Sequence, residues 1–153
     1  MTEIQLFLSH AIQLEREAAA RYVELAAAME NLGNHEVASF FAKMAIYARR
    51  HLDEAVERGG LHEIPAMDRN AFRWPGGESP EAPELDDIHP LMDVQSALLL
   101  ALEGEHRSQR FYSQVCSLTQ DDTVRVVAAE FSIEEAEHVA LLQNWLQRSS
   151  VAS

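Results

Sequence analysis

Three glutamates and two histidines are the residues of this sequence whose types and spacing point to chemistry. Glu135 and His138 stand three positions apart, so a helix would place both side chains on one face. Glu15, His51 and Glu105 lie in three other stretches dominated by helix-forming residues. Carboxylates and imidazoles are ligands of iron, manganese and zinc, so these five side chains would form a metal site if the fold brings them together.

Four helices are predicted to position these side chains. Gly33 and Asn34 interrupt the first half of the chain, and residues 119–122 interrupt the second half with helix-capping types. Residues 59–90 hold four of the six glycines and all five prolines. We therefore predict two tight helical hairpins joined by a crossover loop over about 59–89, with helices over about 2–31, 35–58, 90–118 and 121–148.

The long connection indicates the topology of the bundle. A helix of about 25 residues is about 37 Å long, and roughly a dozen extended residues cover that distance. A loop of about thirty residues can therefore run the length of the bundle and make the third helix parallel to the second. Two hairpins joined in this way form an all-α, ferritin-like four-helix bundle, predicted here as a single domain over 1–153.

Each predicted helix carries an apolar seam with alternating spacings of three and four residues, as a bundle core requires. The seams of the first and third helices match at an offset of 90 residues, and those of the second and fourth match at 87, which indicates a duplicated hairpin. The polar positions in the seams fall at one level. Glu15 lies 18 residues before Gly33 and His51 lies 18 after it, so the five polar side chains are predicted to meet in one buried layer.

This layer needs a compensating charge. A buried ion costs several kcal/mol, and we expect no lysine or arginine in the seams to pair the carboxylates. Two divalent metal ions would satisfy them, and Glu from two helices with Glu-x-x-His from the others is the di-iron carboxylate pattern. The alternative is a polar core without metal, since a single seam glutamate more often faces water. The coincidence of several such positions at one height favours the metal.

Three segments resemble the rubrerythrin-like branch of the ferritin superfamily: AIQLEREAAARYVELA, ALEGEHRSQRFYSQVC and AAEFSIEEAEHVALL. The resemblance covers the chain except for the crossover. It implies di-iron chemistry with oxygen or peroxide, including peroxide reduction and oxidation of ferrous iron.

The resemblance also implies roles for seven residues. The two glutamates of the first and third helices would be terminal ligands, and the fourth helix would give a bridging glutamate and a histidine. A histidine of the second helix would complete the ligand set, and two tyrosines would serve the reaction by holding the carboxylates. In that order these residues are Glu15, Glu105, Glu135, His138, His51, Tyr22 and Tyr112.

Two departures from the family pattern stand out. Ala48 occupies the position of the glutamate in the first Glu-x-x-His motif, so one bridging carboxylate is missing, and Glu54 is a candidate to replace it. The cysteine pairs of a rubredoxin module are absent, so electrons would come from a separate donor. Ala48 also keeps two other interpretations open. One is a degenerate bundle with one metal or none that acts as an interaction or iron-associated protein, and the other is a purely structural metal site.

Composition narrows the remaining functions. The 25 acidic and 12 basic residues give a formal charge of −13, which disfavours binding to nucleic acid. The longest apolar run, 97–102, is too short to cross a membrane, and the first ten residues do not resemble a signal peptide, so we predict a cytoplasmic protein.

The single Cys116 excludes an internal disulfide and is expected to be a buried thiol. Phe72 and Trp74 in the loop, together with the family resemblance, suggest a homodimer.

Several other polar residues fall off the seams. We predict surface positions for the histidines His10, His35, His62, His89 and His106, and solvated positions for the glutamates Glu17, Glu103, Glu130 and Glu134. By contrast, Met29 and Met44 fall on the seams and are predicted to lie in the core.

Overall fold

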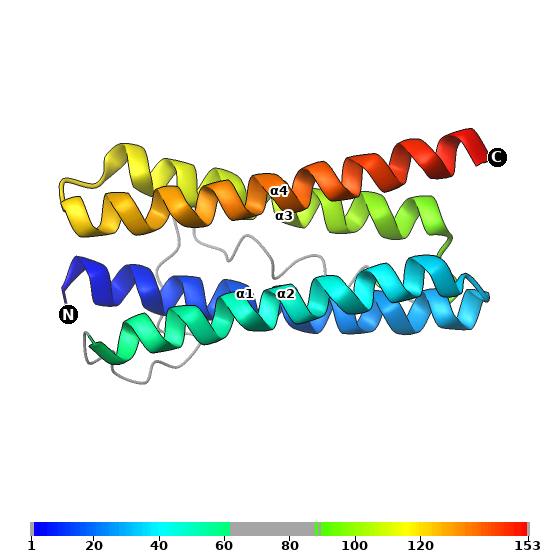
Figure 1. Ribbon diagram of the computed structural model, residues 1–153, viewed down its shortest axis with the longest axis horizontal. Helices are drawn as coiled ribbons and strands as arrows, with labels where there is room; N and C mark the ends of the chain where they lie inside the picture. The colour runs from blue at the N-terminus through cyan, green and yellow to red at the C-terminus, as the bar shows by residue number, and fades with distance from the viewer. Residues whose placement is uncertain (1, 62–87, 89, 153) are drawn as a thin grey trace.

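The computed structural model describes residues 2–61, 88 and 90–152 and shows a bundle of four helices (Figure 1). The helices are α1 (Glu3–Leu32), α2 (His35–Leu61), α3 (Val94–Leu118) and α4 (Asp122–Ala152), and the described residues contain no strand. The predicted fold class is confirmed. Most of the predicted crossover lies outside the described residues, as do His62, His89, Phe72 and Trp74.

The two hairpin turns form where the sequence predicts them. Gly33 adopts a left-handed conformation with φ 86° and ends α1, and its backbone N–H donates to the carbonyl of Glu30. Asn34 then caps α2, because its side chain accepts a 3.0 Å hydrogen bond from the backbone N–H of Val37. In the second hairpin Asp121 plays the same part for Val124, also at 3.0 Å.

The third helix begins at Val94, later than the sequence pattern predicts. Asp93 lies in an extended conformation before it and accepts a 2.7 Å hydrogen bond from the backbone N–H of Ser96. This cap fixes the start of α3. The second helix runs on to Leu61, three residues past its predicted end.

Figure 1 shows that α2 ends at one end of the bundle and α3 begins at the other. The two helices therefore run parallel, as the length of the predicted crossover allows. Each hairpin is antiparallel, and the hairpin of α3 and α4 lies over that of α1 and α2. This is the ferritin-like arrangement.

The apolar core is divided into two clusters. One contains Met29, Met44 and Leu98 among others, which confirms both methionines as core residues. The other contains Leu8 and Phe131 among others. On every helix the predicted metal-binding positions fall between the residues of these two clusters, so the polar layer interrupts the core near its middle.

No helix in the described part of the chain is long and apolar enough to cross a membrane.

Candidate metal centre

All four helices contribute to one buried group of carboxylates and imidazoles. The ligand atoms of Glu15, His51 and Glu135 lie within 4.8 Å of one another. Those of Glu105, Glu135 and His138 do so as well. The structure thus brings the five predicted side chains together, and Glu135 belongs to both groups. Each group could hold a metal ion, and the two groups have one carboxylate in common.

The buried atoms of the site fit a metal. Glu135 Oε2 and His138 Nδ1 lie 3.5 Å apart, and neither has a hydrogen-bond partner in the described part of the chain. Such atoms are costly to bury unless something pairs with them. A divalent cation would accept lone pairs from both, and the mixed carboxylate and imidazole donors suit iron, manganese or zinc.

The pKa values of two carboxylates at the centre are shifted in opposite directions. Burial, together with the negative charges of Glu105 and Glu15, raises the pKa of Glu135 well above its usual range. The pKa of Glu105 is lowered, because the polar contacts of its carboxylate with Glu135 and His138 and the positive charge of Arg21 outweigh the effect of its burial. In the metal-free protein the carboxyl group of Glu135 is therefore protonated, whereas that of Glu105 is ionised. A bound cation would displace that proton.

Two tyrosines form hydrogen bonds between the two hairpins. The hydroxyl of Tyr22 in α1 donates a short hydrogen bond to Glu105 in α3. The hydroxyl of Tyr112 in α3 donates to Glu15 in α1 over 3.3 Å. Burial and the nearby carboxylates raise the pKa of both phenols, so both stay protonated and act as donors. This reciprocal pattern follows the duplication that the 90-residue offset indicates.

A buried arginine lies beside the site. Arg21 is fully buried, and its Nη2 lies 3.9 Å from Glu105 Oε1. Its guanidinium also lies 5.2 Å from the ring centroid of Tyr22. Arg21 stands one residue from the predicted seam, and its long side chain reaches a charge that its backbone position does not suggest. The carboxylates therefore have a basic neighbour, which comes from a position beside the seam and not from the seam itself.

Glu134 contacts the site, whereas the sequence pattern places it in solvent. Its Oε2 lies 2.7 Å from His51 Nε2, and its side chain is 31% exposed. The other ring nitrogen of His51, Nδ1, lies 3.6 Å from Glu15 Oε1. Burial disfavours the charged imidazole, but Glu134 and Glu15 outweigh it and raise the pKa of His51 to about 10. The sequence feature from which this contact could have been predicted is that Glu134 directly precedes the ligand candidate Glu135.

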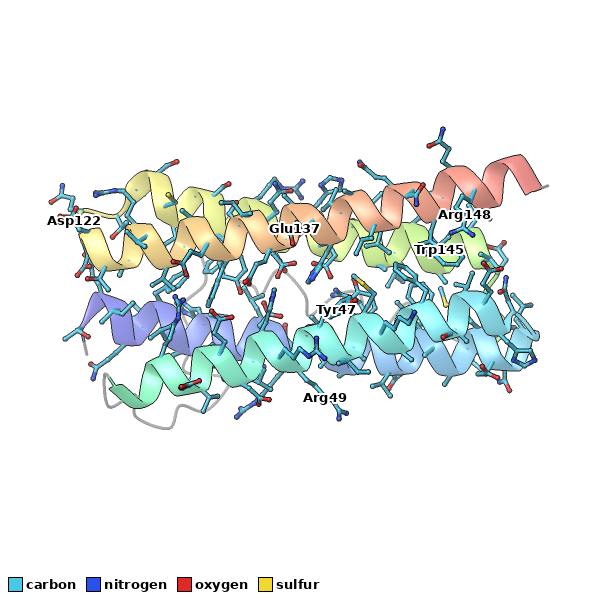
Figure 2. The ribbon with its side chains drawn as sticks, in the orientation of Figure 1. Tyr47, Arg49, Asp122, Glu137, Trp145 and Arg148 are labelled. Atoms are coloured by element: carbon cyan, nitrogen blue, oxygen red, sulfur yellow. The ribbon has the colours of Figure 1, made fainter. Side chains whose placement is uncertain are left out.

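Aromatic stacking holds the two imidazoles between α2 and α4. The ring of His51 lies between those of His138 and Phe131, at centroid distances of 5.3 and 6.4 Å. Tyr47 stacks on the other side of His138 at 6.2 Å, with an angle of 14° between the rings. Tyr47 lies between α2 and α4 in Figure 2. Rings from the two helices alternate in this stack, which restricts the rotation of both imidazoles.

The candidate replacement for the missing glutamate does not enter the site. Glu54 Oε1 forms an ion pair with Arg58 Nη2 at 3.1 Å, and its side chain is 37% exposed. Ala48 is buried and packs with Ala18 and Ala19. Its methyl group leaves α2 with no carboxylate at this level.

Two predictions of solvated residues on α1 are wrong. His10 is buried, with its ring edge against Phe111 at 6.0 Å. Glu17 is also buried and accepts a 3.0 Å hydrogen bond from Gln13. Both lie on α1, which packs against α3 as well as α2, so its buried arc is wider than one seam.

The remaining residues that were predicted to lie outside the site differ in their exposure. His35, Glu103 and Glu130 are exposed, as predicted. His106 and Cys116 are half-buried, so the thiol is less enclosed than the seam position suggests.

Comparisons with known proteins agree with this architecture. Residues 5–150 match the family described as a ferritin-like domain. The chain is also similar to a crystal structure of an uncharacterized conserved protein from Magnetospirillum magnetotacticum MS-1. The two are 38% identical, with a TM-score of 0.78, over 97% of this chain and 95% of that chain. No curated protein sequence matches the chain.

Proposed function

The chain belongs to the ferritin-like family, and from this we propose that it is a di-iron protein of the rubrerythrin-like kind. The proposed reaction is oxidation of ferrous iron coupled to reduction of peroxide or oxygen. The observation that carries the proposal is that Glu135 is shared between two groups of ligands, as a bridging carboxylate would be.

The proposed ligands divide between two positions. Glu15 and His51 would hold one metal, Glu105 and His138 would hold the other, and Glu135 lies close enough to both pairs to serve either metal. When bound, the iron pair supplies two electrons and a coordination position for oxygen or peroxide.

The protein's own groups prepare this site and manage its protons. Tyr112 and Tyr22 hold Glu15 and Glu105 by hydrogen bonds, so that the carboxylates keep their orientation whether or not metal is bound. Glu135 and His51 both hold protons in the metal-free protein and must release them to act as ligands. The apolar clusters on either side limit the access of water to the layer.

Reduction of one hydrogen peroxide to two waters takes two electrons and two protons, which matches the oxidation of two ferrous ions. Repeated turnover then needs an electron donor, and we propose that a separate protein supplies the electrons. We place this reaction in the cytoplasm as part of the same proposal.

A homodimer is also proposed. Val126 and Ile133 stand seven residues apart on α4 and are 58% and 61% exposed. Apolar side chains at this spacing form one stripe of a helix, and a second copy of the chain would cover it. Sedimentation should give a mass near twice 17.2 kDa, whereas a mass near 17.2 kDa at micromolar concentration would contradict this part of the proposal.

The main alternative is a bundle that binds one metal or none and has no redox activity, which the absence of a carboxylate at Ala48 favours. Anaerobic loading with ferrous iron followed by addition of peroxide separates the two. The proposed function predicts consumption of one peroxide for every two ferrous ions bound. Glu135→Ala should abolish this reaction, and Glu137→Ala, an exposed change on the same helix, should preserve it. Iron that binds but does not consume peroxide or oxygen would favour a structural site.

A further inference from the structure

The duplication makes the two histidines of the site comparable position by position. At the offset of 87 residues, His138 corresponds to His51, Glu135 to Ala48 and Glu134 to Tyr47. α4 therefore presents two successive carboxylates, whereas α2 presents a phenol and a methyl group at the same places. The two imidazoles therefore have different neighbours at corresponding positions. The ring of His138 stacks on Tyr47, whereas the ring of His51 contacts the carboxylate of Glu134.

This asymmetry matters for charge. The ligand carboxylates Glu15, Glu105 and Glu135 carry at most −3, against +4 for two divalent ions. Arg21 beside Glu105 enlarges the imbalance. Uncompensated charge in a buried site is expensive, so the second metal ion should bind poorly unless another anion is near.

Glu134 is placed to supply that anion. Its carboxylate lies 2.7 Å from His51 Nε2, on the side of the ring away from the Glu15 contact. With the proton of neutral His51 on Nε2, the Nδ1 lone pair is free to face the metal position. The contact is close without the alignment of a hydrogen bond, so Glu134 acts on His51 through its charge, which favours the tautomer with the proton on Nε2 and increases the basicity of the ring.

The neighbouring carboxylates on this side of the bundle are engaged elsewhere. Arg58 Nη2 pairs with Glu54 at 3.1 Å and with Glu130 at 2.7 Å. Glu134 is therefore the additional carboxylate that the described structure brings to His51.

We infer that Glu134 is a positioning residue that takes over, from behind His51, the charge that α2 lacks at Ala48. It sustains the metal position formed by Glu15 and His51, while the position formed by Glu105 and His138 depends on it little. The inference rests on the proposed two-metal centre.

The test is titration of the metal-free protein with Co²⁺ under anaerobic conditions, followed by calorimetry and by the visible absorption of bound Co²⁺. The parent should bind two ions per chain. Glu134→Gln, which keeps the shape and removes the charge, should weaken the second ion about 10- to 100-fold and leave the first unchanged. Glu137→Gln, an exposed carboxylate on the same helix, is the matched control and should change neither affinity.

A rescue experiment distinguishes lost charge from disturbed packing. Ala48→Glu in the Glu134→Gln background should restore the second affinity toward that of the parent, because it returns the carboxylate to the duplicated position. If circular dichroism shows that this variant does not fold, Ala48→Asp replaces it. A weakened second ion that neither Ala48 variant restores, although folded, would overturn charge replacement as the role of Glu134.

The remaining outcomes separate this inference from the proposed function. Two ions bound equally tightly by the parent and by Glu134→Gln would leave the metal centre standing and contradict the inference. A parent that binds no Co²⁺ and no ferrous iron would contradict the proposed function, and the inference with it.

Discussion

Tyr112 in one hairpin donates a hydrogen bond to Glu15 in the other, and Tyr22 returns the same contact to Glu105. These buried bonds to carboxylates connect the two halves of the bundle at the level of the candidate site. Each tyrosine is almost fully buried, so loss of its hydroxyl would leave a buried carboxylate with one donor fewer.

Tyr112→Phe and Tyr22→Phe should therefore each lower the free energy of unfolding of the metal-free protein by about 1.5–3 kcal/mol, the range for hydrogen bonds to charged groups. Urea unfolding measures this. Tyr47→Phe is the control, because the Tyr47 ring stacks on His138 and is 37% exposed. Equal losses from all three substitutions would show that the cross-hairpin hydrogen bonds contribute nothing specific.

His10 should make the protein sensitive to acid. Burial lowers the pKa of His10 to about 4 from 6.5, so the folded protein keeps this ring neutral where the unfolded chain binds a proton. The associated stability is present above pH 6.5 and is lost as the pH falls toward 4, on the order of 3 kcal/mol in total. In His10→Leu the free energy of unfolding should fall less steeply over this interval. Parallel pH profiles for parent and variant would contradict the neutral buried state.

Metal binding should release protons. His51, with a pKa of about 10, and Glu135, with a raised pKa, are both protonated at pH 7 in the metal-free protein. Apparent metal affinity should therefore increase from pH 6 to 8. Calorimetry in buffers with different ionisation enthalpies should report more than one proton released for a filled site. Heats that do not depend on the buffer would show that the ligands are already deprotonated.

The two glycines near the ends of α2 should respond in opposite ways to alanine. Gly33 has φ 86°, so Gly33→Ala should destabilise the protein by about 1–2 kcal/mol. Gly60 is helical, with nothing within 4 Å of an added Cβ, so Gly60→Ala should stabilise it by about 0.5–1 kcal/mol. Thermal melts of the two variants test the pair, and equal shifts in melting temperature would contradict the assigned backbone conformations.

Much of the fold and the central site could be predicted because both depend on periodic spacing. Glu15 and Glu105 stand at seam positions, and a seam residue of a bundle helix faces the core almost regardless of neighbouring sequence. The level of His51 followed from its distance to Gly33, since rise per residue is constant in a helix. These features depend on backbone geometry alone.

The residues that escaped prediction depend on side-chain reach and on how each helix is rotated. Arg21 stands one position from the seam, and a long flexible side chain brings its guanidinium to Glu105. Glu134 is half-buried at the edge between α2 and α4, where a small rotation of the helix decides between solvent and His51. His10 and Glu17 are buried by the contact of α1 with a second helix, which a single-seam pattern does not describe.

Anomalous diffraction at the iron edge, on crystals loaded with ferrous iron without oxygen, tests the two-metal site most directly. The account predicts two peaks per chain on either side of Glu135, one beside Glu15 and His51 and the other beside Glu105 and His138. The first of these should have the lower occupancy when iron is limiting. A fully loaded crystal with no peak in this layer would contradict the account.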